Sequence, residues 1–344
     1  METRERKPVY YGEYLQLDKI LNAQAPESDK EGIDAGDEML FIIIHQTYEL
    51  WFKLVLHELG IIRKIFSKPN IHDNDPDIYN CVHRLKRIGQ ILQVAVSQMS
   101  VLETMTPLDF LDFRDLLRPA SGFQSIQFKM IEAVLGLRFE QRHGKAYYLS
   151  QLKPEDVERV KQFEEGKSLL TLINQWLERM PYLRDNTYWG AQKTADFWPQ
   201  YRAAYAASLS EGERQNLDGF DKLFGNAGYP EGRSFSAEAG RNALFIMLYR
   251  DLPLLQLPYE LLNTLLETDE LLSLWRHRNI HLVQRTIGKR VGTGGSSGAE
   301  YLRGAADSHY IFKEVAELTS FLLPRNMLPK LPDLLVQELC YTRK

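Results

Sequence analysis

The longest helical pattern in this 344-residue chain runs through residues 37–68, where apolar side chains recur with the period of an α-helix over about eight turns. Helix-start signals lie at 75–77, 106–109 and 210–213. Later helices are expected at 236–250, 258–267, 269–287 and 306–323, with a break at 119–122 and a loop at 223–235. Since no run alternates like a β-strand and no internal repeat is visible, the sequence predicts an all-α fold.

A single histidine, His45, lies in the most apolar part of this pattern, FIIIHQTYELWFK at 41–53. At about 100° per residue it shares one helix face with Phe41, Tyr48, Glu49 and Phe52. Burying an imidazole without a hydrogen-bond partner is costly. Either the fold satisfies His45 internally or a ligand does.

An arginine, Arg114, lies one turn before the PASG break, on a face that it shares with Phe110 and Leu117. A guanidinium beside aromatic rings suits a carboxylate partner held in a fixed geometry. The alternative is a salt bridge to a nearby acid, Asp112 or Asp115.

A glycine-rich segment, KRVGTGGSSG, occupies residues 289–298. Its glycines let backbone N–H groups converge on an anion or a small polar ligand. Thr293, between Gly292 and Gly294, places a hydroxyl where the backbone can approach such a ligand closely. No GK[ST] closes the segment and it follows a helix, so it is neither a Walker loop nor a dinucleotide fingerprint. A flexible linker is the alternative.

Composition excludes several classes of protein. Apolar residues make up 44% of the chain and charged residues 26%, as in ordinary soluble proteins. A net charge of −4 gives no electrostatic basis for nucleic-acid binding. Cys81 and Cys340 form neither a zinc motif nor a disulfide framework. The N-terminus lacks the apolar run of a signal peptide, and no stretch looks long and apolar enough to span a membrane. We therefore expect a cytoplasmic protein without a nucleic-acid or membrane partner.

Four motifs then occur in order: YYGEYLQLDKILNAQ at 10–24, FIIIHQTYELWFK, the DFR…PASGFQS run and GTGGSSG. Together they resemble the tryptophan 2,3-dioxygenase family over about residues 10–330. The resemblance implies a haem iron enzyme of tryptophan catabolism through kynurenine. Such an enzyme uses O2 to open the indole ring of L-tryptophan, or of a close derivative, to N-formylkynurenine. It also implies an all-α homotetramer, with one large helical domain over 36–344. The N-terminal segment 1–35 would complete the site of a neighbouring subunit.

The resemblance also implies a role for each position that matches a motif. His45 would be the distal, catalytic histidine that hydrogen-bonds the indole N–H, and Arg114 would pair with the substrate carboxylate. The implied substrate-binding set is Phe41, Phe110, Arg114, Leu117, Gly292, Thr293 and Gly294 of one subunit, with Tyr11, Tyr14 and Leu15 of its neighbour.

One position departs from the family pattern. The family holds the haem iron through a histidine four residues after a tryptophan, whereas here Asn279 lies four residues after Trp275. A helical stripe that contains Leu272, Trp275, Asn279, Leu282 and Thr286 predicts that Asn279 faces the site. His277 and His281 should then project to the opposite side. An amide is a poor axial donor to ferrous haem.

Two hypotheses follow from this departure. The first is a haem dioxygenase whose axial ligation is weak, absent or rearranged. The second is a relative that binds tryptophan or another indole amino acid without normal haem. That relative would be a regulatory protein or an enzyme with a different cofactor.

Overall fold

The computed structural model describes residues 8–69, 71, 76–143, 150, 152–184, 186–189, 197–225, 228–293 and 298–340. Within these ranges the regular structure is helical and contains no β-strand, which confirms the all-α prediction. The α-helices are α1 (Tyr11–Leu15), α2 (Leu17–Leu21), α3 (Glu27–Glu31), α4 (Asp37–Phe66), α5 (Pro76–Leu102), α6 (Pro107–Arg114), α7 (Ile126–Leu135), α9 (Pro154–Glu165), α10 (Leu169–Glu178), α11 (Asn186–Trp189), α12 (Phe197–Ser208), α13 (Gln215–Phe224), α14 (Ala237–Leu248), α15 (Pro253–Ile287), α16 (Gly298–Ser308), α17 (Lys313–Glu317) and α18 (Asp333–Leu339). Short 3-10 turns are η1 (Asp115–Leu117), η2 (Gly122–Gln124), η3 (Phe139–Gln141), η4 (Glu211–Glu213), η5 (Leu318–Phe321) and η6 (Arg325–Met327).

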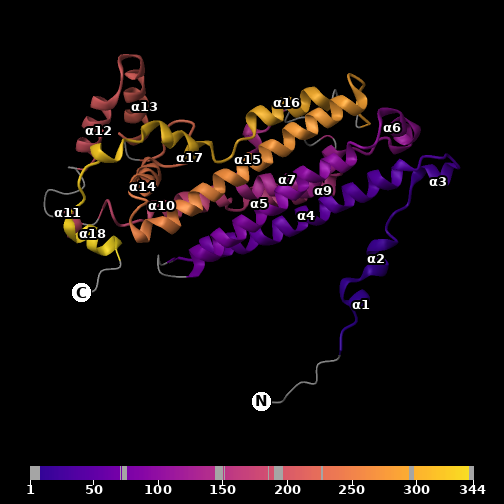
Figure 1. The fold of residues 1–344 in the computed structure, drawn as a ribbon, viewed down its shortest axis with the longest axis horizontal. Helices are drawn as coiled ribbons and strands as arrows, with labels where there is room; N and C mark the ends of the chain where they lie inside the picture. Colours follow the sequence, from indigo (N-terminus) through magenta and orange to yellow (C-terminus); the bar gives the residue numbers. More distant parts are fainter. Residues whose placement is uncertain are drawn as a thin grey trace.

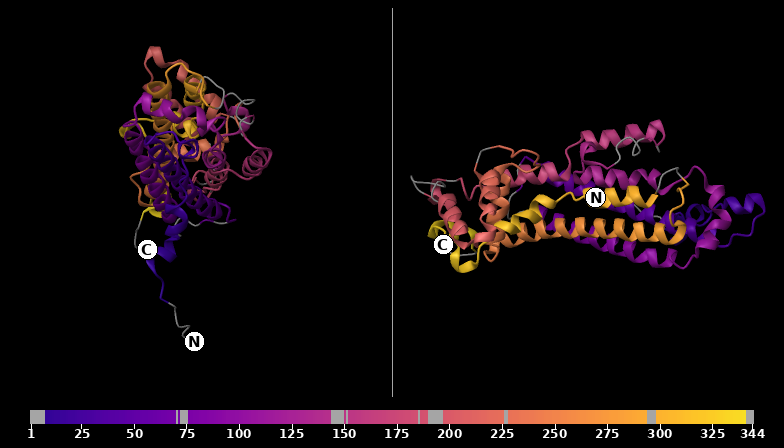
Figure 2. Two further views of the ribbon diagram at one scale, coloured as in Figure 1. Left: turned by 90° about the vertical axis from the view of Figure 1, so that its right-hand side faces the viewer. Right: turned by 90° about the horizontal axis from the view of Figure 1, so that it is seen from above.

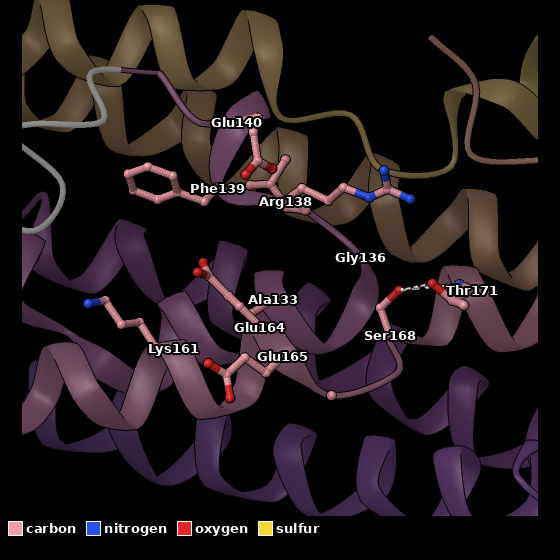
Figure 3. A pocket seen from close by; sticks show the side chains of 12 residues that line it. Ala133, Gly136, Arg138, Phe139, Glu140, Lys161, Glu164, Glu165, Ser168 and Thr171 are labelled. Atoms are coloured by element: carbon pink, nitrogen blue, oxygen red, sulfur yellow. Dashed lines mark hydrogen bonds between the residues drawn. The ribbon is translucent and has the colours of Figure 1, made fainter. Parts of the chain in front are cut away.

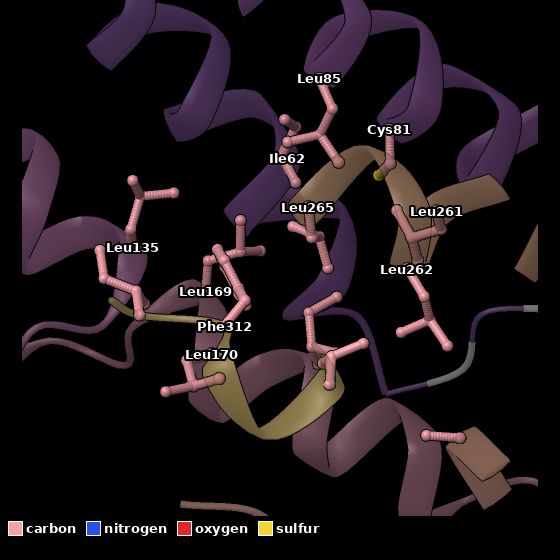
Figure 4. Close-up of a cluster of buried hydrophobic side chains, with 14 of the residues drawn as sticks. Ile62, Cys81, Leu85, Leu135, Leu169, Leu170, Leu261, Leu262, Leu265 and Phe312 are labelled. Atoms are coloured by element: carbon pink, nitrogen blue, oxygen red, sulfur yellow. The ribbon is translucent and has the colours of Figure 1, made fainter. Parts of the chain in front are cut away.

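Three long helices, α4, α5 and α15, lie side by side and form the body of the molecule (Figure 1). Helix α5 packs against both α4 and α15, and α7 and α10 pack on α4. Figure 4 shows the apolar side chains that fill the space between them, from helices far apart in the sequence. Among them, Leu59, Ile62, Leu85, Leu261 and Leu265 are completely or almost completely buried.

The two ends of this bundle differ. At one end α12, α13 and α14 form an aromatic cluster, in which the Tyr201 and Tyr205 hydroxyls donate to the Phe321 and Ser320 carbonyls at 2.5 and 2.9 Å. At the other end lie α6, the start of α4 and the last turns of α15. Figure 2 shows the same arrangement from the side and from above.

Helix α6 begins where the sequence predicts. Thr106 accepts from the backbone N–H of Asp109 at 3.3 Å, and the Asp109 carboxylate accepts from the N–H of Thr106 at 2.8 Å. This reciprocal capping box, with Pro107 in the first turn, satisfies backbone donors that a helix start leaves unpaired. It fixes the direction in which Phe110 and Arg114 enter the bundle.

Two expected helix boundaries are wrong. The sequence predicts separate helices at 258–267 and 269–287, but α15 is continuous from Pro253 to Ile287. Asp269 does not cap a new helix. Its carboxylate accepts from the backbone N–H of Phe312 at 2.6 Å. The chain turns at Phe312, so the helix predicted at 306–323 is divided into the end of α16, α17 and η5.

Helix α4 corrects the expectation that no stretch could span a membrane. Its 30 residues include an 18-residue window with a mean hydropathy of 1.3, enough for a span by length and composition alone. In the fold, however, α4 packs against α5, α7 and α10. One face of α4 therefore belongs to the bundle core, although only 22% of the apolar window is buried in the single chain.

Candidate functional site

His45 is held by its own helix. Its Nδ1 lies 2.7 Å from the Phe41 carbonyl oxygen, one turn earlier in α4. A carbonyl can only accept, so Nδ1 carries the proton and Nε2 keeps a lone pair. Burial lowers the pKa of His45, against the raising effects of the Phe41 carbonyl and the Glu49 charge. The neutral ring can therefore accept a hydrogen bond through Nε2.

Aromatic rings extend from His45 in two directions. Towards α6, the Phe41 ring lies 4.1 Å from that of His45 and 5.7 Å from that of Phe110. Towards α15, the Tyr48 ring lies 6.2 Å from both His45 and Trp275. The structure thus brings the predicted residues Phe41, His45 and Phe110 together and links them to the Asn279-bearing helix.

Arg114 is buried, with 6% of its surface exposed, at the last residue of α6. One Nη donates to the Val291 carbonyl, and the other lies 3.5 Å from the Asp115 carboxylate. Asp115 is 76% exposed, so water screens this pair, and the buried Nε of Arg114 has no partner. The alternative predicted from the sequence, a salt bridge between Arg114 and a nearby acid, is present only as this 3.5 Å contact with Asp115. Among the residues that the structure describes, the guanidinium has no buried counter-charge.

The bond to Val291 brings the start of the glycine-rich segment to α6. Gly292 and Thr293 follow directly and are partly buried, whereas Gly294 lies outside the described residues. His45, Arg114 and Thr293, remote along the chain, therefore lie on elements that meet at one end of the bundle.

Leu117 lies just beyond α6, which ends at Arg114. It belongs to the 3-10 turn η1, where side chains three residues apart eclipse, so the shared side with Arg114 stays a prediction. It is partly buried against the core.

The N-terminal residues lie far from this site in the single chain. Tyr11 and Tyr14 on α1 are 71% and 74% exposed, and Leu15 is 37% exposed. Figure 1 shows α1 and α2 projecting away from the bundle. Helix α3 is the anchor of this segment, because the Glu38 carboxylate accepts from the N–H groups of Glu27 and Ser28 at 2.9 Å.

Within the stripe on α15, ring contacts show the direction of Trp275, whereas the orientation of Asn279 towards the site stays a prediction. Trp275 contacts the rings of Tyr48, Phe52 and Phe128 at 6.2, 6.1 and 4.7 Å, so this face of α15 is turned towards α4 and α7. Asn279 is partly buried one turn later. His277 and His281 are exposed, and His277 Nδ1 lies 2.9 Å from the Ser273 carbonyl.

Sequence reasoning missed the residues that fasten the segment after PASG to α4. The Glu49 carboxylate accepts from Ser125 Oγ at 2.6 Å and from Gln127 Nε2 at 2.8 Å. Ser125 also caps α7 by accepting from the N–H of Phe128. The signal was available, because Glu49 falls on the His45 face of α4 and is the acid nearest to His45 along the chain.

A separate cavity of about 310 Å³ lies between the end of α7, α9 and the start of α10 (Figure 3). Lys161, Glu164 and Ser168 line it, and Glu164 is bonded to Arg142 at 3.2 Å. None of the predicted site residues borders this cavity. Its charged lining does not suit an indole ring, so the end of the bundle at His45 remains the candidate site.

Comparison with known proteins gives a consistent result. The family model for tryptophan 2,3-dioxygenase matches residues 2–222 and 220–322. The tryptophan 2,3-dioxygenase of Dictyostelium discoideum is 41% identical, over 97% of this chain and 88% of its own length. That of Alteromonas mediterranea is 41% identical over 95% and 96%, and that of Xenopus laevis 40% identical over 94% and 84%. With these matches along nearly its whole length, this chain belongs to the tryptophan 2,3-dioxygenase family.

Proposed function

We propose that this protein uses O2 to open the indole ring of L-tryptophan, or of a closely related indole amino acid, to N-formylkynurenine or its analogue. The supporting observation is the convergence of His45, Arg114 and the Val291–Thr293 backbone beside a set of aromatic rings. Both atoms of O2 are added across the indole C2–C3 bond, which breaks. One substrate and one O2 therefore give one product, without an external reductant.

Each side chain has a task that its surroundings suit. Neutral His45 accepts the indole N–H through Nε2, and Phe41 and Phe110 contact the ring. Arg114 pairs with the substrate carboxylate, because it is a buried cation with no buried anion beside it in the described ranges. Thr293 offers its hydroxyl to the amino-acid end. Fixing both ends of the substrate orients the C2–C3 bond before reaction.

Family membership implies haem, which would activate O2 when bound. The described residues do not fit a haem whose iron is ligated from α15. Asn279 presents a neutral amide at the expected position, and the nearby imidazoles of His277 and His281 are exposed on the other side of the helix. Within the described ranges, no group of three or more His, Cys, Asp or Glu side chains could hold another metal ion.

This mismatch favours a second candidate function. The protein would then bind tryptophan or another indole amino acid without haem-dependent turnover, as a regulatory protein or with a different cofactor. The contacts proposed for His45 and Arg114 are the same in both cases, so binding alone does not separate them.

We further propose a cytoplasmic homotetramer in which residues 1–35 complete a neighbouring subunit's site. Exposed apolar side chains support this assembly, both on α1 and on α4, where Met39, Ile43 and Leu50 are 40%, 45% and 51% exposed. Sedimentation should give the mass of four chains. A monomer that binds tryptophan with full affinity would exclude the shared site.

The test of function is product formation from L-tryptophan under ¹⁸O2, by protein expressed with ample haem. We expect N-formylkynurenine carrying two ¹⁸O atoms, and loss of product in His45→Ala and Arg114→Ala. Tryptophan binding measured by calorimetry without any product would support the second candidate. Absence of both product and binding would refute both proposals.

A further inference from the structure

The chain between α6 and α7, residues 115–125, meets the face of α4 that carries His45 at both of its ends. At one end, two aromatic rings of α6 lie 5.7 and 5.6 Å from the ring of Phe41, one helical turn before His45. At the other end, Ser125 bonds to Glu49, one turn after His45. His45 therefore lies between the two points at which this segment contacts α4.

The length of the 115–125 segment does not fix its path. Phe41 and Glu49 are about 12 Å apart along the axis of α4, whereas an extended chain of this length could span about 36 Å. Part of the excess length is taken up in turns with local bonds. Ser121 and Gln124 form a capping box, and Gln124 Nε2 donates to the Pro119 carbonyl at 3.3 Å. A segment with this much spare length needs contacts that hold it on α4.

Three hydrogen bonds that converge on Glu49 supply such contacts. Ser125 Oγ donates to one carboxylate oxygen at 2.6 Å. Gln127 Nε2 donates to the other oxygen and to the Glu49 backbone carbonyl, both at 2.8 Å. Hydrogen bonds to an ionised acceptor are stronger than those between neutral groups. A second carboxylate at position 127 could not donate and would repel Glu49.

We propose that Glu49 is a positioning residue for the indole end of the site, which holds the 115–125 segment over His45. While the three bonds persist, the segment keeps water from the imidazole. When they break, water reaches His45 and competes with the indole N–H for Nε2. The inference rests on the proposed function for the role of His45, but the covering of His45 is a property of the chain without substrate.

The experiment measures how fast diethyl pyrocarbonate modifies individual histidines of the full-length protein at neutral pH, by mass spectrometry of its peptides. Two histidines serve as internal references. His277 is exposed, and His309 is buried, with 5% of its surface accessible. In the wild type we expect His45 to react at least about tenfold more slowly than His277.

The decisive variant is Gln127→Glu, which replaces a donor to Glu49 with a like charge. It should raise the modification rate of His45 by about tenfold, because hydrogen bonds to a charged group are lost. The double variant Glu49→Gln/Gln127→Glu exchanges donor and acceptor and should return the rate to within about threefold of the wild type. Gln124→Glu is the matched control. It makes the same change within the segment, where a carboxylate can still complete the capping box, and should change the rate less than twofold.

The inference is wrong if wild-type His45 reacts as fast as His277, or if Gln127→Glu leaves the rate for His45 unchanged. It is also wrong if the double variant reacts as fast as Gln127→Glu alone. The rate for His309 reports on the fold. If His309 also becomes reactive in Gln127→Glu, Glu49→Asp replaces that variant, since it keeps the charge but shortens the side chain. Glu49→Asp should likewise accelerate His45, and an unchanged rate would refute the inference.

Tryptophan binding tests the consequence for the site. Gln127→Glu should weaken the affinity for L-tryptophan by about fivefold, and should weaken it no further when His45→Ala is already present. Additive losses would show that Glu49 does not act through His45. The modification rates are measured without substrate, so the two proposals can fail separately. Accelerated modification in a chain that does not bind tryptophan would refute only the function. Product formation with an unresponsive His45 would refute only the inference.

Discussion

Two buried arginines of this molecule are held in opposite ways. Arg276 donates to the buried Glu132 carboxylate at 2.8 Å and to the His309 carbonyl at 2.9 Å, and Arg142 donates to the same carboxylate at 2.7 Å. Arg114 is also buried, yet among the described residues its one carboxylate contact is the exposed Asp115 at 3.5 Å.

This difference distinguishes buried charges that stabilise the fold from a buried charge that is available to bind a ligand. Around Glu132 the cations are neutralised inside the protein, and the cluster joins α7, α15 and the chain that follows α16. At Arg114 the neutralising anion is absent from the described residues, so a ligand carboxylate can take that place without displacing an internal partner. The contrast predicts which substitutions damage stability and which damage binding.

The largest effect should come from Glu132→Gln. Burial alone would raise the pKa of Glu132, but Arg276, His309 and Arg142 together lower it well below its ordinary value of 4.5. Removing the charge leaves the buried Arg276 guanidinium without its carboxylate partner and Arg142 with Glu164 as its remaining described carboxylate, at a cost of about 3–5 kcal/mol in unfolding free energy. Urea unfolding at neutral pH measures it, with Glu140→Gln, an exposed residue of η3, as the matched control.

The same variant has a pH signature. A carboxylate with a lowered pKa in the folded state stabilises above its unfolded value, and that contribution disappears as pH falls through the folded value. Wild-type stability should therefore decline as the pH drops below about 4.5, whereas Glu132→Gln should lack this part of the decline. Equal acid sensitivity in the two proteins would contradict the assignment.

Arg114→Ala should reduce binding more than stability. Loss of a charge-assisted bond to the ligand carboxylate is worth about 1.5–3 kcal/mol, or about 10- to 100-fold in the dissociation constant of L-tryptophan. Calorimetry with tryptamine, which lacks the carboxylate, is the control and should show little change. An equal loss for both ligands would mean that Arg114 only supports the fold of the Val291 segment.

His45→Ala should have a smaller effect, about fivefold on L-tryptophan affinity, because a neutral hydrogen bond contributes about 1 kcal/mol. Since burial lowers the pKa of His45, wild-type affinity should stay constant down to its ordinary value of 6.5 and fall only at lower pH, where the ring becomes charged. 1-Methyltryptophan has no indole N–H, so its affinity should not depend on His45. A fall that begins well above pH 6.5 would contradict a neutral acceptor.

Asp115→Asn should have the smallest effect. A screened surface pair contributes less than about 0.5 kcal/mol, so both the unfolding free energy and the tryptophan affinity should be nearly unchanged. A clear loss in either measurement would show that Asp115 neutralises Arg114 and would remove the contrast with Arg276.

The sequence was sufficient for features with local causes. The capping box at Thr106–Asp109 and the period of α4 depend on neighbours in the chain, and both agree with the structure. The predicted boundaries of α15 and of the helix at 306–323 were wrong. These two segments are joined by a tertiary bond between Asp269 and Phe312, which no local pattern shows.

In the candidate site, too, features with local causes could be predicted from the sequence, whereas tertiary contacts could not. The positions of Phe41 and His45 follow from helical spacing, and the orientation of Asn279 was predicted from a stripe on α15. The bond from Arg114 to Val291 joins residues far apart in the sequence and could not be predicted from spacing. The Glu132 cluster was missed as well, although an acid among the apolar residues Met130, Ile131 and Ala133 of α7 was a visible signal.

The unbroken length of α15 limits how this protein could recover an imidazole on the pocket side. Bringing His277 or His281 inward would require the helix to turn by about 160° about its axis. Because 35 residues form a single rod of about 50 Å, such a turn would also drag Leu261, Leu265 and Leu272 out of the core, where each has no exposed surface. Each leucine brought into water would cost about 1.5–3 kcal/mol. The buried leucines of α15 therefore prevent the helix from rotating about its axis. A substitution of Asn279 by histidine would cost much less free energy than such a rearrangement.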